Sequence, residues 1–499
     1  MGKRTQKNQK VIEGNRRNER TNNKTTRKNK AGRKQQQKAP EPVTADLVKV
    51  LIDHFFPDLN RDLSRLPDPR LDVKIIYSKE HLFYLGLSMF LFHCGSRNQL
   101  ESERQTIAFY YNLLALSGTN EEEIATVGAM NNFMQIMNPK NGIELLPGYM
   151  VRSLIRSRAL DKYRNLHGEF MIALDGVHLF TKKGTHANSI SKTINGEQYS
   201  YYYALEAKLV TEDGLGLSLA TVFIETEKEF DKEDCELNAF YRLEKIIKER
   251  FPRMKICVLL DGLYANKHVL DICEDNKWAY YITLKEGSLP KAYNAAMLKI
   301  NNSPKLSMDH SPEYGVYQHL SWALNVKHEG RHFHVIKCEE IKITKDGITK
   351  KTFIWLTDTR PDKNNIVQLV KEARCRWVVE EMFNIQKNGG YELEHNYGTV
   401  GFAMKNYYYL LQISHILHQL LVRSDLFLKL QKKIIIHQFS QWPEKIKLFL
   451  AVMAKTTLGH FRTIKNFVKR LGESFRNQSF SELTNPEILG KIQIRLDSS

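Results

Sequence analysis

Two short apolar runs constrain the fold of this 499-residue chain more than any other feature of its sequence. Residues 169–174 lead into an Asp-Gly pair that begins at Asp175, and residues 255–260 lead into one that begins at Asp261. A continuous apolar run of this length, bounded by a turn signal, is typical of a strand buried on both faces of a sheet. Each run is therefore predicted to be a buried strand that ends at its aspartate.

The surrounding segments alternate between strand and helix patterns. Two aromatic and β-branched stretches flank Glu212-Asp213-Gly214, which is typical of a hairpin turn. Helical patterns then lie on both sides of the second apolar run. The predicted strands cover residues 199–209, 215–225 and 278–283, and the predicted helices cover about 232–250 and 265–276. This alternation predicts an α/β fold.

Three carboxylates are candidates for one site. A carboxylate at the end of a strand in an α/β sheet lies at the edge where ligand sites form. Taken singly, an Asp-Gly pair is more often a plain turn, but Asp175 and Asp261 share a local context that could bring their strands side by side. With Glu380 on a later helix, they would suffice to hold two Mg²⁺ ions for phosphoryl transfer, and Mn²⁺ is able to substitute.

The stretch 373–387 carries the third of these carboxylates. On a helix, Arg376, Glu380 and Lys387 fall on one face. The carboxylate would bind a metal ion while the two cations bind DNA phosphates; the alternative is an exposed helix with ordinary ion pairs. Three neighbouring residues point elsewhere and are expected to be buried: Trp377, Val378 and Met382.

Other chemistries find less support. The sequence has no Gly-rich phosphate loop, no nucleophile elbow and no zinc-type spacing. Its histidines between residues 310 and 334 lack metal-ligand spacing. Five further acids could compete with the three candidates: Glu206, Asp234, Glu236, Glu381 and Glu394. Of these, Glu381 is turned about 100° from Glu380 on the helix.

The charge of the chain indicates a polyanionic partner. The formal net charge is +18, which favours nucleic acid over an acidic membrane. Residues 1–42 are predicted to be a disordered basic tail, either an arm on DNA or a solubilising segment. The six cysteines are scattered and no apolar leader is present, so we expect mostly buried, reduced thiols in an intracellular protein with no membrane partner.

Together these residues resemble the DDE-class insertion-sequence transposases marked by a Tyr-Arg-Glu-Lys signature. The arginine of that signature precedes the glutamate by four positions and the lysine follows it by seven, as in Arg376, Glu380 and Lys387. Asp175 in IALDG and Asp261 in LLDGLYAN resemble the family's two aspartates. The signature tyrosine would fall on Ala373, so a tyrosine contact to DNA is missing. The resemblance covers about residues 168–397.

The resemblance implies a fold and a division of the chain. It implies a ribonuclease-H-like catalytic core within residues 165–400, with a β-rich insertion at about 287–351. A helical, DNA-binding region (43–164) would precede the core, and a helical region (401–499) would follow it. The strand patterns of the insertion and its Lys345-Asp346-Gly347 turn agree with this independently. Arg152, Arg156 and Arg158 of the helical region either face DNA or are simply solvated.

The resemblance also implies an activity. The protein would bind the ends of a mobile element, cleave the DNA and join the 3′ ends to target DNA. Its partner would be double-stranded DNA, both terminal inverted repeats and target, on which it would assemble as a homodimer in the cytoplasm, associated with the nucleoid. The alternatives are a nuclease, or a catalytically silent DNA-binding protein, on the same fold.

Overall fold

The computed structural model describes residues 45–225, 235–425, 464–478 and 480. The described residues all fall within one compact unit, which spans Val43–Ser499. The predicted basic tail lies outside the described residues, as do residues 226–234, 426–463, 479 and 481–499.

Helices occupy the segment before the first strand, as their apolar spacing predicted. They are α2 (Asp46–Phe55), α3 (Leu59–Ser64), α4 (Lys79–Leu91), α5 (Arg97–Glu103), α6 (Ile107–Ser117), α7 (Val127–Ile136) and α8 (Leu146–Arg156). Hydroxyl side chains begin several of them; Thr126, for example, accepts a hydrogen bond from the amide of Ala129, which satisfies one of the free N–H groups of the first turn of α7.

The described strands form one ten-stranded sheet in the order β2-β3-β1-β5-β6-β10-β9-β8-β7, with β4 paired to β3. The strands are β1 (Phe170–Lys183), β2 (Ile190–Ile194), β3 (Glu197–Val210), β4 (Gly216–Ile224), β5 (Ile256–Leu260), β6 (Ala279–Thr283), β7 (Ser307–Glu313), β8 (Val316–His328), β9 (Arg331–Thr344) and β10 (Gly347–Thr357). The pairs β1–β5 and β5–β6 are parallel, and the other pairs are antiparallel. The α/β fold class is confirmed.

The strands of the β-rich segment continue the main sheet. β10 pairs with β6, with Trp355 opposite Thr283, and so joins β7–β10 to the parallel strands. This junction is apolar and buried on both faces of the sheet, because the consecutive residues Ile354, Trp355 and Leu356 of β10 are all buried. A helix that the strand patterns did not predict, α11 (Pro290–Asn302), opens the segment and packs against β8.

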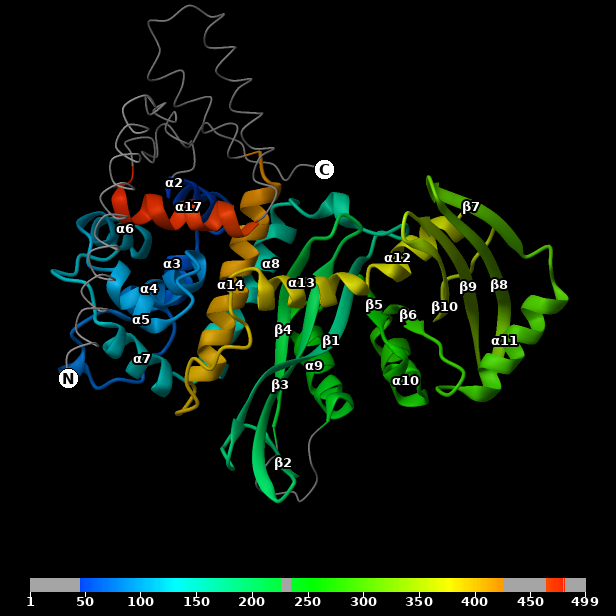
Figure 1. The fold of residues 1–499 in the computed structure, drawn as a ribbon, viewed down its shortest axis with the longest axis horizontal. Helices are drawn as coiled ribbons and strands as arrows, with labels where there is room; N and C mark the ends of the chain where they lie inside the picture. Colours follow the sequence, from blue (N-terminus) through cyan, green and yellow to red (C-terminus); the bar gives the residue numbers. More distant parts are fainter. Residues whose placement is uncertain (1–44, 226–234, 426–463, 479, 481–499) are drawn as a thin grey trace, which may run out of the picture. The chain divides into compact units, whose positions relative to one another are not determined.

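Two sets of helices cover opposite faces of the central strands. The remaining helices are α9 (Glu236–Arg250), α10 (Lys267–Asn276), α12 (Ile366–Arg374), α13 (Trp377–Asn388), α14 (Ala403–Arg423) and α17 (Ile464–Asn477). In β1, Asp175 interacts electrostatically with residues of α13, whereas a side chain at Gly176 would meet Glu236 of α9. Since consecutive strand residues point to opposite faces, α13 and α9 lie on opposite sides. Figure 1 shows α13 crossing β4, β3 and β1, against which it packs.

A buried polar network joins β3 to both α13 and α14. Glu206 and Lys208 of β3 are fully buried, and their charged atoms lie 3.3 Å apart. Glu206 accepts hydrogen bonds from Thr221 at 2.7 Å and Tyr408 at 2.5 Å.

The network continues into α13. The ammonium group of Lys208 donates to Gln412 of α14 at 2.8 Å, and Gln386 of α13 donates to the same oxygen at 2.9 Å. Buried charges persist only when paired and hydrogen-bonded, so this network fixes how α13 sits on the sheet.

Two further findings concern membrane-spanning helices and the cysteine thiols. Among the described residues, no helix combines the length and apolar character needed to cross a membrane. The six cysteines all belong to the described residues and none forms a disulfide; five are buried while Cys235 is exposed. This agrees with the prediction of mostly buried thiols.

Lys208→Met should lower the free energy of unfolding by about 3–5 kcal/mol, because it leaves the carboxylate of Glu206 buried without its counter-charge. The double variant Glu206→Gln/Lys208→Met removes both charges and should recover much of that loss. Urea unfolding of the three proteins measures the difference. A loss below about 1 kcal/mol in the single variant would show that the pair is not what holds these elements together.

Candidate active site

The register of two parallel strands places Asp175 beside Asp261. β1 and β5 are paired from Phe170 opposite Ile256 to Ala173 opposite Leu259. Two residues beyond the last matched pair come Asp175, still within β1, and Asp261, the residue that follows the end of β5. Both aspartates therefore lie just past the same end of the parallel pairing, on two adjacent strands.

The expectation that the first strand ends at Asp175 is wrong. β1 continues to Lys183, because β3 remains its antiparallel partner as far as the pair Lys183–Tyr199. What ends near Asp175 is the pairing with β5. The second strand does end as predicted, at Leu260, and Asp261 then accepts a hydrogen bond from the amide of Leu263 at 2.7 Å.

Glu380 approaches the aspartates from α13. Its carboxylate forms an ion pair with Arg376 at 2.5 Å. Both groups interact electrostatically with Asp175, Arg376 lowering and Glu380 raising its pKa. The structure therefore brings Asp175, Arg376 and Glu380 together, as the helix-face pattern indicated.

The helix that carries Glu380 is interrupted. α12 ends at Arg374 and α13 begins at Trp377, and the amides of Cys375 and Val378 bond three residues back instead of four, which tightens the turn. Arg376 keeps a helical conformation and so stays one turn from Glu380. Val378 and Met382 are buried as expected, but Trp377 is 44% exposed, with its ring edge-on to Phe353.

The carboxyl group of Asp175 is strongly perturbed. Its pKa is raised to about 7, and burial is the largest cause. Arg376 opposes the rise, whereas Glu380 and Glu236 add to it. Buried like charges repel each other, so at neutral pH this carboxylate is held in an unfavourable ionised state or keeps its proton. A group perturbed by both burial and neighbouring carboxylates is typical of a functional site.

Glu236, at the start of α9, is a fourth member of this group. It accepts a hydrogen bond from the hydroxyl of Tyr264 at 2.7 Å. Burial raises its pKa, and Asp261 raises it further. Its carboxylate oxygen lies only 2.7 Å from where a Cβ at Gly176 would be, so glycine leaves room for it. We call Asp175, Glu236, Asp261 and Glu380 the acidic cluster.

The sequence placed Glu236 only among the competing acids, and Tyr264 was missed. Nothing in the local pattern distinguishes Glu236, because its proximity to Asp261 arises from the way α9 packs on the sheet, against β3 and β4. Of the other competitors, Glu206 belongs to the buried network, Glu381 is exposed, and Glu394 pairs with Lys387. Asp234 lies outside the described residues.

Lys387 lies apart from Glu380. Its ammonium group is 2.8 Å from the carboxylate of Glu394, and both charges act on the pKa of His178, which burial lowers. His178 is three residues beyond Asp175 in β1. Lys387 is therefore placed near the continuation of β1, while Arg376 is at the acidic cluster.

The donor set of the acidic cluster suits a hard cation. Its ligand atoms would all be carboxylate oxygens, which Mg²⁺ and Mn²⁺ prefer. As the side chains stand, no three or more His, Cys, Asp or Glu residues of the described chain are close enough to hold a metal ion. All four acids face protein donors instead: Glu380 faces Arg376, Glu236 faces Tyr264, and Asp175 and Asp261 face the amides of Gly176 and Leu263. Metal binding would require these contacts to loosen.

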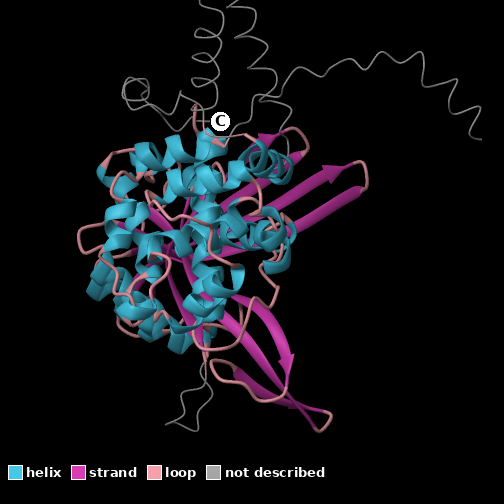
Figure 2. Cartoon of the chain, turned by 90° about the vertical axis from the view of Figure 1, so that its left-hand side faces the viewer, coloured by secondary structure: helices cyan, strands magenta, loops and turns pink. Residues whose placement is uncertain are grey.

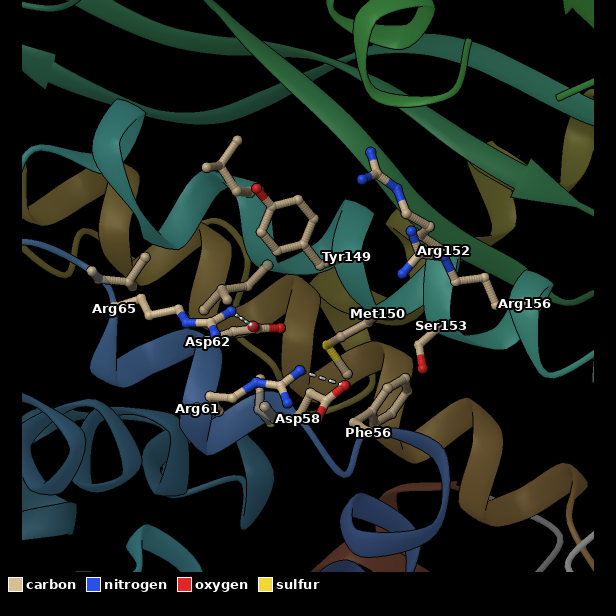
Figure 3. A pocket seen from close by; sticks show the side chains of 14 residues that line it. Phe56, Asp58, Arg61, Asp62, Arg65, Tyr149, Met150, Arg152, Ser153 and Arg156 are labelled. Carbon is tan, nitrogen blue, oxygen red and sulfur yellow. Dashed lines mark ion pairs between the residues drawn. The ribbon is translucent and has the colours of Figure 1, made fainter. Parts of the chain in front are cut away.

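A separate cavity of about 490 Å³ lies between α3 and α8 (Figure 3). Two of its arginines are already paired, Arg61 with Asp58 at 2.8 Å and Arg65 with Asp62 at 3.8 Å. The guanidinium of Arg152 lies over the rings of Tyr149 and Phe251.

Arg156 of the same cavity is exposed and forms no ion pair with any described residue. None of the lining residues belongs to the acidic cluster. Of the three arginines predicted to be either DNA-facing or solvated, Arg152 is thus engaged by aromatic rings, whereas Arg156 and Arg158 are exposed.

The sequence matches no protein-family model and no curated protein.

Asp175→Asn should change how stability depends on pH. A carboxyl group whose pKa rises on folding from 3.8 to about 7 weakens the folded state as pH rises through that window, because the unfolded chain releases the proton first. The variant should therefore gain roughly 2–4 kcal/mol relative to the wild type between pH 4 and pH 7, and no more above it. Thermal unfolding at each pH in EDTA measures this, with the exposed Asp346→Asn as control. Parallel pH profiles for wild type and Asp175→Asn would contradict the burial of this charge.

Proposed function

We propose that this protein is a metal-dependent DNA transposase of the DDE class. The observation that carries the proposal is the parallel register that sets Asp175 beside Asp261, with Glu380 of α13 close to the first aspartate. Two carboxylates at adjacent strands and one on a covering helix match the order and spacing of the motifs that resemble this family.

The sheet supports a ribonuclease-H-like core. β4, β3 and β1 are antiparallel neighbours, and β5 and β6 continue the sheet as parallel strands on the other side of β1. Three antiparallel strands followed by two parallel ones, with helices on both faces, are the arrangement that such a core requires. In this reading β7–β10 are the β-rich insertion, which enters between the second aspartate and the glutamate.

The chemistry assigned to the site is phosphoryl transfer. Asp175, Asp261 and Glu380 would hold two Mg²⁺ ions, or Mn²⁺, which supply activation of the attacking oxygen and stabilisation of the leaving oxygen. Arg376, once released from Glu380, presents a planar fork that suits two phosphate oxygens.

The proposed partner is double-stranded DNA, both the terminal inverted repeats of an element and the target. The net charge of +18 supports a polyanion. The candidate cations are Arg376 and Lys387, at the two ends of α13, and the exposed Arg156 at the end of α8. We place the protein in the cytoplasm, associated with the nucleoid, and expect a homodimer assembled on DNA.

One departure from the family pattern has a structural consequence. Ala373, at the position of the signature tyrosine, is 1% exposed on α12. This position faces the core, so a contact to DNA from it is not part of the proposal. A nuclease on the same fold is the second candidate, because it would use the same acidic cluster and differ only in the fate of the free 3′ hydroxyl.

Asp261→Asn should abolish Mg²⁺-dependent DNA cleavage while leaving DNA binding intact. It keeps side-chain volume and removes a charge that would hold the metal, so cleavage of a plasmid bearing the DNA that flanks the gene should fall by more than about 100-fold. Glu381→Gln, an exposed acid on α13, is the matched control and should cleave normally. Joining of the cleaved 3′ ends to a second plasmid distinguishes a transposase from a nuclease. Full cleavage by Asp261→Asn would overturn the site.

Arg376→Ala should lower the salt dependence of DNA binding by roughly one unit of log–log slope, as expected for one lost phosphate contact. Lys387→Ala tests the second cation in the same way. If the two cations only neutralise Glu380 and Glu394, each variant should keep the wild-type slope and lose about 0–1 kcal/mol of stability. Titrations of one duplex oligonucleotide over a range of salt concentrations separate the two outcomes.

A further inference from the structure

A row of tyrosines lies on β3, away from the acidic cluster. Tyr199, Tyr201 and Tyr203 alternate along the strand and therefore share one face. All three are partly exposed. The register shows what stands opposite them on the neighbouring strands, since directly paired residues of antiparallel strands lie side by side on the same face.

Cations and a histidine complete this face. Tyr199 is paired with Lys183 of β1 on one side and with Lys192 of β2 on the other. Tyr203 is paired with His178 of β1. We call the set of Tyr199, Tyr201, Tyr203, His178, Lys183 and Lys192 the tyrosine platform.

The rings of the platform are ordered relative to one another. Tyr201 and Tyr203 are nearly parallel, 11° apart, with ring centroids separated by 6.2 Å. His178 lies 5.1 Å from Tyr203. The 6.2 Å separation is near the outer limit of ring contact, so the tyrosines do not use up each other's faces.

The charged side chains beside the tyrosine platform are mainly lysines. The ammonium group of Lys192 lies 5.5 Å from the ring centroid of Tyr201 and forms no ion pair with any described residue. Lys183 pairs with Glu197, which also accepts a hydrogen bond from Tyr199 at 2.8 Å. Lys182 donates to the hydroxyl of Thr399. By alternation Lys182 lies on the opposite face from the platform, so Lys183 and Lys192 are the two lysines that stand beside the tyrosines.

The platform is close to the acidic cluster but not part of it. The far ends of β1, β2 and β3 extend past the helices that cover the sheet (Figure 2). His178 is three residues beyond Asp175, or about 10 Å along the strand. By alternation His178 lies on the face of Gly176 and α9, opposite to the face from which Asp175 points.

We propose that the tyrosine platform binds unpaired nucleotides of a single DNA strand. Aromatic side chains offer stacking surfaces to exposed bases, and interleaved lysines offer charge to the phosphates between them, which is the combination that single-strand binding uses. A duplex hides its base faces and does not profit from the rings. The choice of DNA as the ligand rests on the proposed function, since cleavage exposes a strand end beside the site.

The test measures binding of a labelled 12-nucleotide single strand and of a matched duplex by fluorescence anisotropy, using the full chain at 0.2 M salt. Tyr201→Ala and Tyr203→Ala should each weaken single-strand binding by about 10-fold and leave duplex binding within about 2-fold. Tyr201→Phe and Tyr203→Phe keep the ring and should bind as the wild type. Lys192→Ala should weaken single-strand binding and lower its salt dependence.

Several results would overturn the platform. Unchanged single-strand binding in the alanine variants would do so, and so would an equal loss in the phenylalanine variants, which would point to the hydroxyls. An equal loss on single strand and duplex would indicate general charge attraction. Asp261→Asn separates this proposal from the proposed function: it should bind the single strand normally even though it does not cleave. If the wild type cleaves DNA and the tyrosine variants bind the single strand as it does, the proposed transposase function stands and the platform proposal fails.

Discussion

β1 pairs with β5 on one side and with β3 on the other, and these two pairings position both the acidic cluster and the tyrosine platform. Up to Ala173, β1 is the parallel neighbour of β5, and this pairing aligns the two aspartates. Beyond that point only β3 accompanies it, as far as Lys183. One strand therefore contributes a carboxylate where the parallel pairing ends and a row of exposed side chains where the antiparallel pairing continues. The site and the platform are close together for that reason.

Electrostatic repulsion is built into the acidic cluster and is offset by neighbouring groups. Burial and the charges of Glu380 and Glu236 both act against ionisation of Asp175. In the structure Arg376 and Tyr264 relieve part of this repulsion by engaging two of the acids. A divalent cation would relieve it more completely. Arg376 and Tyr264, which engage two of the acids in the structure, would then be free to contact a substrate phosphate.

The placement of α13 depends on groups far from the cluster in sequence. Gln386, two turns beyond Glu380, is held by Gln412. Gln412 accepts from Lys208 of β3, which is itself paired with Glu206. Because β3 also pairs with β1, the network ties the helix that carries the glutamate to the strand next to the first aspartate. Rigid support of this kind is what a site needs when its ligands come from separate elements.

The sequence by itself determined the α/β class, the two buried strands with their aspartates, the hairpin of β3 and β4, and the helical face shared by Arg376 and Glu380. These features depend on local periodicity and turn residues, which a linear pattern records. The tertiary structure alone decided that β1 runs on past Asp175, that Trp377 is exposed, that Lys387 pairs with Glu394, and that Glu236 joins the cluster. Each of these depends on which element packs against which, and contacts between residues distant in the chain leave no local pattern to predict them.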